Sequence, residues 1–246
     1  MRSFWSEPFL WIHLSGAAAL PIFLGLCLLG LAVGSPLLPV WLEMFLVAVA
    51  GIFPVLWMQW FRPFYIFSIL VVAVKPQNLT SLQHRILTRF KTKLNKGLAL
   101  FVPVLLALFL WQLYRFAPLA ASVAPFPPSW RWAGLLLAAS AFLASNLFLQ
   151  VSSSVLAVLL TPESEFAATK PYVLEKIRQD FTIAPWQVDR LLPALAGETT
   201  VAVAAPAESI GPASGIENSL ADSIINPKPA DTKSVTSLPE QSSEKK

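Results

Sequence analysis

Charged residues are absent from four long stretches of this 246-residue chain. A run of about 20 apolar residues, rising 1.5 Å per residue as a helix, crosses the ~30 Å hydrocarbon core of a bilayer. The stretches without Asp, Glu, Lys or Arg are residues 8–42, 44–61, 97–114 and 132–162. This pattern predicts an all-α, polytopic membrane protein with four transmembrane helices.

The four spans are expected at about residues 14–33, 38–60, 98–116 and 132–151, inside a transmembrane domain that covers residues 1–160. Gly34, Ser35 and Pro36 are typical of a tight turn, so the first two spans should form an antiparallel hairpin. Prolines at 21, 54 and 103 fall within the first three spans, where each is expected to kink its helix.

Residues 64–74 form a shorter apolar stretch, which Pro63 separates from the second span. Eleven residues are too few to cross a bilayer as a helix, so we expect an interfacial or re-entrant helix here. The alternative is a fifth span, which would place Arg62 deep in lipid at a cost of about 2.5–3.5 kcal/mol.

A basic amphipathic helix is predicted over residues 81–96. Thr80 and Gln83 have the spacing of a capping box at its start. Its basic face consists of Arg85, Arg89, Lys93 and Lys96. These four are candidate contacts for anionic headgroups or for a partner; the alternative is ordinary charge that sets topology.

The chain changes character after residue 160. Residues 161–196 predict a short cytoplasmic segment with two helices, the second at about 185–196. Residues 197–246 contain no aromatic residue and are rich in Ser, Ala, Pro, Glu and Lys, which predicts a disordered low-complexity tail. This segment and the tail are the candidate contacts for a protein partner.

Composition supports a membrane protein and indicates its orientation. The chain is 55% hydrophobic and 13% charged, with a mean hydropathy of +0.61, whereas soluble domains carry about 25% charged residues. The loop at 61–96 holds seven Lys or Arg and no acid, so it should be cytoplasmic, together with both termini. The basic balance therefore reflects topology, and nucleic acid is not an expected partner.

Polar residues inside the spans are candidates for function. Glu43 lies within about two turns of the outer end of its span, where it can reach the interface or line a path. Asn146 and Gln150 belong to a polar patch on the fourth span, which serves either helix packing or permeation. The same span has a small-residue face for close packing, formed by Gly134, Ala138, Ala141 and Ser145.

Motifs for catalysis or for metal and cofactor binding are missing from the sequence. It has no HExxH, GxSxG, Walker A or GxGxxG pattern, and two His and one Cys have no ligand spacing. We therefore expect no catalytic residue, no cofactor, no metal and no enzymatic activity.

Several short blocks resemble a known family. They are MRSFWSEPFLW at 1–11, PVW at 39–41, LWMQW at 56–60 and RPFYIFS at 62–68. Together with the tail, they resemble the low-complexity tail membrane proteins of cyanobacteria over about residues 1–195, and the tail matches only in type. The resemblance implies an inner or thylakoid membrane and no catalytic residue.

Two functions are consistent with these patterns. The first is a non-enzymatic accessory or scaffold protein, whose cytoplasmic helices and tail engage a partner. The alternative is a small transporter or pore subunit, with a polar path near Glu43 and the polar patch of the fourth span.

Overall fold

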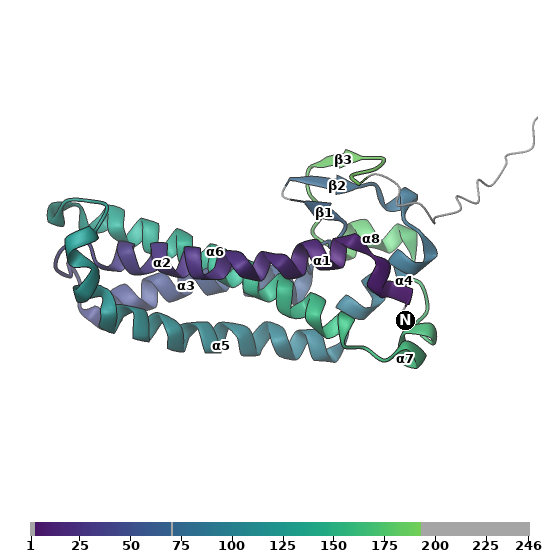
Figure 1. Cartoon of the computed structure of the whole chain (residues 1–246), viewed down its shortest axis with the longest axis horizontal. Helices are drawn as coiled ribbons and strands as arrows, with labels where there is room; N and C mark the ends of the chain where they lie inside the picture. Colours follow the sequence, from purple (N-terminus) through teal and green to yellow (C-terminus); the bar gives the residue numbers. More distant parts are fainter. Residues whose placement is uncertain (1–2, 70, 193–246) are drawn as a thin grey trace, which may run out of the picture. The chain divides into compact units, whose positions relative to one another are not determined.

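The computed structural model describes residues 3–69 and 71–192, which belong to one compact unit. Four helical segments are long and apolar enough to cross a membrane: Pro8–Leu31, Val40–Phe61, Lys93–Val123 and Pro128–Leu159. They run side by side in Figure 1, with the three strands and several short helices gathered at one end. The predicted fold class, with four spans, is confirmed.

The first span is interrupted, whereas the second and third pass their prolines as continuous helices. It consists of α1 (Pro8–Ser15), the 3-10 turn η2 (Gly16–Ala19) and α2 (Leu20–Leu31). Pro21 has no N–H to donate to Ala17, so the turn before it is not held as an α-helix. Pro54 and Pro103 lie inside α3 (Val40–Phe61) and α5 (Lys93–Phe116), and η4 (Ala117–Val123) extends the third span.

The fourth span lies at the centre of the bundle. It begins with η5 (Pro128–Trp130) and continues as α6 (Arg131–Leu159), which packs against α1, α2, α3 and α5. The connection between the first two spans also contacts it. Gly34 has φ +62°, and a Cβ there would lie 2.2 Å from the Pro128 carbonyl oxygen, so only glycine fits this turn.

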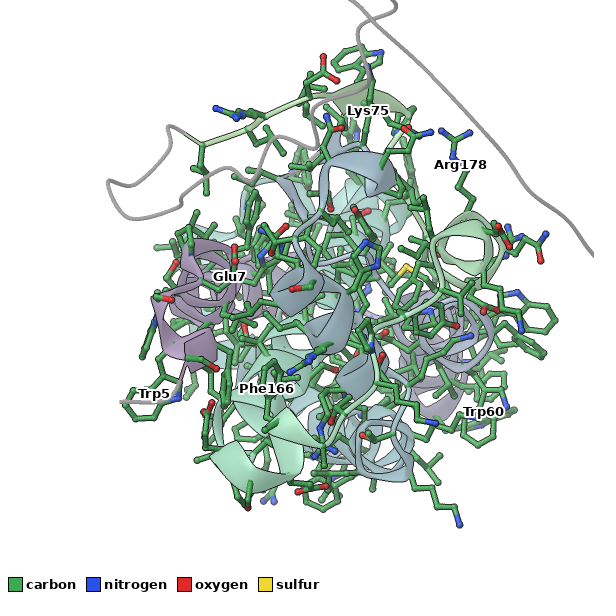
Figure 2. The ribbon with its side chains drawn as sticks, turned by 90° about the vertical axis from the view of Figure 1, so that its right-hand side faces the viewer. Trp5, Glu7, Trp60, Lys75, Phe166 and Arg178 are labelled. Atoms are coloured by element: carbon green, nitrogen blue, oxygen red, sulfur yellow. The ribbon has the colours of Figure 1, made fainter. Side chains whose placement is uncertain are left out.

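We call the folded end of the bundle the cap, defined as residues 3–7, 62–92 and 161–192. Its elements are η1 (Ser3–Ser6), β1 (Ser68–Ile69), β2 (Val72–Val74), η3 (Pro76–Asn78), α4 (Ser81–Phe90), α7 (Glu163–Ala167), α8 (Leu174–Asp180) and β3 (Trp186–Val188). Buried aromatic rings from segments far apart in the chain meet in its core, among them Phe4 against Phe166, with ring centroids 4.3 Å apart. Figure 2 looks onto this end.

The expected interfacial or re-entrant helix at 64–74 is wrong, and so is the fifth span. The segment contributes β1 and β2, which pair antiparallel, and β2 pairs in parallel with β3. The helix expected at 185–196 is also wrong, since β3 occupies 186–188. The reason is that β-branched Val and Ile side chains favour strands once a partner strand is present, and β2 finds its second partner in β3, more than 100 residues later.

The single helix predicted over 81–96 is divided in two. The capping box at Thr80 and Gln83 is present, but α4 ends at Phe90 and α5 begins at Lys93. The Asn95 side-chain amide donates to the carbonyl oxygens of Arg89 and Phe90, at 3.2 and 3.3 Å. It thereby satisfies carbonyls that the broken helix leaves free. The tail predicted at 197–246 lies outside the described residues.

Candidate functional site

Polar side chains of α6 connect it to each of the other three spans. Each one donates a hydrogen bond to a backbone carbonyl oxygen of a neighbouring span. The bonds run from Ser152 to His13 at 2.9 Å, from Asn146 to Gly51 at 3.0 Å and from Gln150 to Ala99 at 2.9 Å. Such bonds fix the helices relative to one another in an apolar solvent.

The side-chain amides of Asn146 and Gln150 use their nitrogens as donors but not their oxygens as acceptors. Both residues are fully buried, and their side-chain oxygens have no hydrogen-bond partner among the described residues. Ser154, also buried, follows at the same four-residue spacing. Asn146, Gln150 and Ser154 therefore form one polar stripe that runs along α6 toward the cap.

Glu43 and Arg131 form a buried ion pair at the end of the bundle away from the cap. Their side chains are 0% and 2% exposed. Oε1 of Glu43 accepts from the backbone N–H groups of Leu37 and Leu38, at 2.8 and 3.3 Å, while Oε2 accepts from Arg131. The carboxylate thus faces the interior of the bundle and not the interface.

Arg131 also donates hydrogen bonds to the first span, while its Nε has no hydrogen-bond partner among the described residues. Its guanidinium donates to the carbonyl oxygens of Leu31 and Val33, at 2.6 and 2.8 Å. The pair therefore ties α6, α3 and the end of α2 together. Sequence reasoning assigned Arg131 to the loop and missed this role. The sequence did contain one indication of the pair: Glu43 and Arg131 each lie near the start of a span, and both spans start from the same side of the membrane.

The four small residues of α6 lie on its buried side. A Cβ on Gly134 would be 2.6 Å from the Gly30 carbonyl oxygen, and a Cβ on Gly30 would be 2.7 Å from the Ala138 backbone nitrogen. Ala141 and Ser145 continue the same buried face. Here α2 and α6 approach closely enough that their backbones touch.

The four basic candidates do not share one helix face. Arg89 on α4 pairs with Glu165 at 2.8 Å and donates to Thr161 at 3.3 Å, so it is used inside the cap. Arg85 is half-buried, and its Nε has no hydrogen-bond partner among the described residues. Lys93 and Lys96 belong to α5 and are exposed.

A polar network joins α4 to α8 within the cap. The Tyr172 hydroxyl and the Lys91 ammonium both donate to Asp180, the latter at 3.0 Å, and together they hold the pKa of Asp180 below its usual value. Burial, helped by the Asp180 carboxylate, raises the pKa of Tyr172. Burial lowers the pKa of His84, whose Nδ1 lies 3.0 Å from the Tyr172 carbonyl oxygen. The network stabilises the docking of α8.

A cavity of about 340 Å³ opens where the bundle meets the cap. Its polar lining comes from Gln59 on α3, Asn95 and Lys96 on α5, Lys91, and Ser154 on α6. Neither Asn95 nor Gln59 was predicted as a site residue: Gln59 lies in the LWMQW block that only marks the family resemblance, and Asn95 lies at the predicted end of the basic helix. Within residues 3–69 and 71–192, no group of three His, Cys, Asp or Glu side chains could hold a metal ion.

These features define an integral, polytopic helical membrane protein whose fourth span is hydrogen-bonded to the other three and whose four spans carry a small mixed cap. The chain belongs to the low-complexity tail membrane protein-like family, whose model matches residues 6–193. The predicted family membership is thereby confirmed. No curated protein and no solved structure matches the chain.

Proposed function

We propose that this protein is a non-enzymatic accessory or scaffold protein of a bacterial inner or thylakoid membrane. Its bundle holds the cap at the cytoplasmic face, and residues 161–246 engage a protein partner. The observation that carries the proposal is the hydrogen bonding of α6 to all three other spans. A bundle fixed in this way suits a support and leaves the cap and the tail for recognition.

The described part of the cap offers a surface for such a partner. Trp186 on β3 is 66% exposed and lies beside Val71, which is also exposed, with the Trp186 N–H donating to the Val71 carbonyl oxygen at 3.3 Å. Exposed tryptophans are frequent anchors of protein interfaces. A partner that binds residues 161–246 is therefore expected to cover Trp186.

Co-purification from native membranes in mild detergent tests the scaffold. We would compare the full chain, a chain ended at Gly197, and full-length Trp186→Ala, and identify bound proteins by mass spectrometry. Trp132→Ala is the matched control, because Trp132 is 57% exposed at the other end of the bundle. The proposal expects a partner that survives Trp132→Ala and is lost on truncation, on Trp186→Ala or on both. A partner set identical in all four samples would overturn it.

The orientation rests on the basic loop at 61–96 and has its own test. Cys27 is buried and is the sole cysteine, so Cys27→Ala gives a background for single-cysteine labelling. Lys75→Cys in the cap and Leu119→Cys on η4 are both exposed sites. With a membrane-impermeant maleimide on spheroplasts, we expect labelling at 119 and protection at 75. The reverse pattern would place the cap outside.

One observation favours the transporter alternative. Asn146, Gln150 and Ser154 form a polar stripe that ends at the cavity, and the amide oxygens of Asn146 and Gln150 have no hydrogen-bond partner within residues 3–69 and 71–192. The Glu43–Arg131 pair closes the far end, and this argues for a support. Flux across proteoliposomes separates the two functions. A transporter requires a flux that Glu43→Gln changes, whereas the scaffold predicts none above empty liposomes.

A further inference from the structure

The cavity at the junction of bundle and cap contains an unmet hydrogen-bond acceptor. Asn95 is 7% exposed, and its amide nitrogen is used by the Arg89 and Phe90 carbonyls. Its amide oxygen is buried and has no partner among the described residues. A buried carbonyl oxygen in a cavity wall favours a ligand that brings a hydroxyl or another donor.

The same cavity contains an uncompensated cation. Lys91 is paired with Asp180, but no carboxylate of the described residues lies within ion-pair distance of Lys96. The Lys96 ammonium lies 5.7 Å from the centre of the Trp60 ring. An anion that entered the cavity could therefore pair with Lys96, and Lys91 is a second cation in the cavity lining.

The position of the cavity indicates where the ligand comes from. Trp60 is in the last turn of α3 and Lys96 in the first turn of α5, the level at which these helices leave the apolar span. Figure 2 shows Trp60 at the edge of the bundle, on the side opposite Trp5. One turn farther into the apolar span, Trp57 on α3 and Leu100 and Phe101 on α5 are exposed, and this apolar surface suits acyl chains.

We propose that this cavity binds an anionic lipid with a hydroxyl-bearing headgroup. The phosphate or sulfonate pairs with Lys96, a headgroup hydroxyl donates to Oδ1 of Asn95, and the acyl chains lie along α3 and α5. The site does not depend on a protein partner, so it stands or fails separately from the scaffold function.

Native mass spectrometry of the full chain, released from detergent micelles, tests the site with three probe lipids. They are phosphatidylglycerol, phosphatidylethanol with the same charge and no headgroup hydroxyl, and zwitterionic phosphatidylcholine. Lys96→Gln should weaken phosphatidylglycerol retention about tenfold, the range expected for a lost hydrogen bond to a charged group. Lys96→Arg should restore it. Lys93→Gln is the matched control, since Lys93 is exposed on the same helix and does not line the cavity.

Asn95 gives the sharper test. Asn95→Leu should reduce phosphatidylglycerol retention about three- to tenfold, to the level of phosphatidylethanol, and leave phosphatidylethanol unchanged. Loss of both lipids together would contradict a hydroxyl contact. Equal losses for Lys93→Gln and Lys96→Gln would overturn the site in favour of unspecific charge. Displacement of phosphatidylglycerol by free glycerol 3-phosphate would overturn the lipid source and identify a soluble ligand.

Discussion

At the end of the bundle away from the cap, the Glu43 and Arg131 side chains are 0% and 2% exposed, whereas Lys75 and Asp189 in the cap are 40% and 74% exposed. Both are ion pairs, but their surroundings differ. Within the described part of the chain, each charge of the bundle pair contacts its ionic partner and backbone groups, so losing one charge leaves the other buried and unsolvated. In the cap, water replaces a lost partner at little cost. An ion pair of the same chemical kind therefore contributes strongly to the stability of the bundle and little to that of the cap.

The largest effect is expected from Arg131→Met. It leaves Glu43 buried without its cation, and the free energy of unfolding should fall by about 3–5 kcal/mol. Unfolding in mixed micelles titrated with SDS measures it. Arg115→Met, at an exposed site, should change little. The double variant Glu43→Leu, Arg131→Met should regain most of the loss; if it does not, the pair is not the cause.

A smaller loss is expected from Gly30→Ala. The new Cβ would lie 2.5 Å from the Gly134 carbonyl oxygen, so the α2 and α6 backbones must separate. Overpacking of this kind costs about 1–3 kcal/mol. Gly25→Ala on the same helix is the control, because a Cβ there meets nothing within 4 Å. The same SDS titration compares them, and equal stabilities would show that the close approach is unimportant.

Gln150→Leu removes one hydrogen bond between α6 and α5. Hydrogen bonds between membrane helices contribute about 0.6 kcal/mol on average and at most about 1.7 kcal/mol, so the loss should fall within that range. Gln112→Leu, at an exposed position on α5, should not destabilise the protein. If the free energy of unfolding fell as much as for Arg131→Met, the buried ion pair would not contribute more to stability than a neutral hydrogen bond between spans, contrary to our expectation.

The smallest effect should come from acid acting on the cap. The pKa of Asp180 is lowered, so its pairs stabilise the folded cap above the ordinary carboxyl range and are lost as the pH falls through the folded-state value. The protection factors of the amides in residues 172–181, corrected for the intrinsic exchange rate at each pH, should therefore fall as the pH drops below about 4. Asp180→Asn should remove this dependence and leave the exchange of α6 unchanged. Acid-induced exchange in α6 first would contradict it.

The transmembrane part could be predicted because the bilayer requires every span to be a long helical stretch with few or no charged residues. No charge occurs between residues 44 and 61 or between 97 and 114, and the structure has spans there. Glu43 was recognisable as an intramembrane acid, but its partner was not. Arg131 is the first residue of α6 and lies near the start of its span, a position where an arginine usually sets topology. Only the packing of α6 shows that its side chain turns inward.

The cap was predicted less well because its elements depend on distant contacts. The strands have two or three residues, too few for a period-two pattern, and β2 pairs with a strand near the other end of the chain. The side-chain amide of Asn95 caps the last carbonyl oxygens of α4, which ends at Phe90, whereas Asn95 was predicted to lie at the end of a single helix that continues to residue 96. Such features follow from tertiary structure and leave little trace in local composition.

The ion pair also has a consequence for how the protein is made. Arg131 follows Glu43 by 88 residues, which at about 5–20 residues per second amounts to roughly 4–18 s of translation. During that interval the first two spans have emerged and Glu43 has no cation. The span that is hydrogen-bonded to the other three is the last of the four to leave the ribosome, so the bundle cannot close span by span. Assembly of the bundle has to wait until the fourth span has been synthesised.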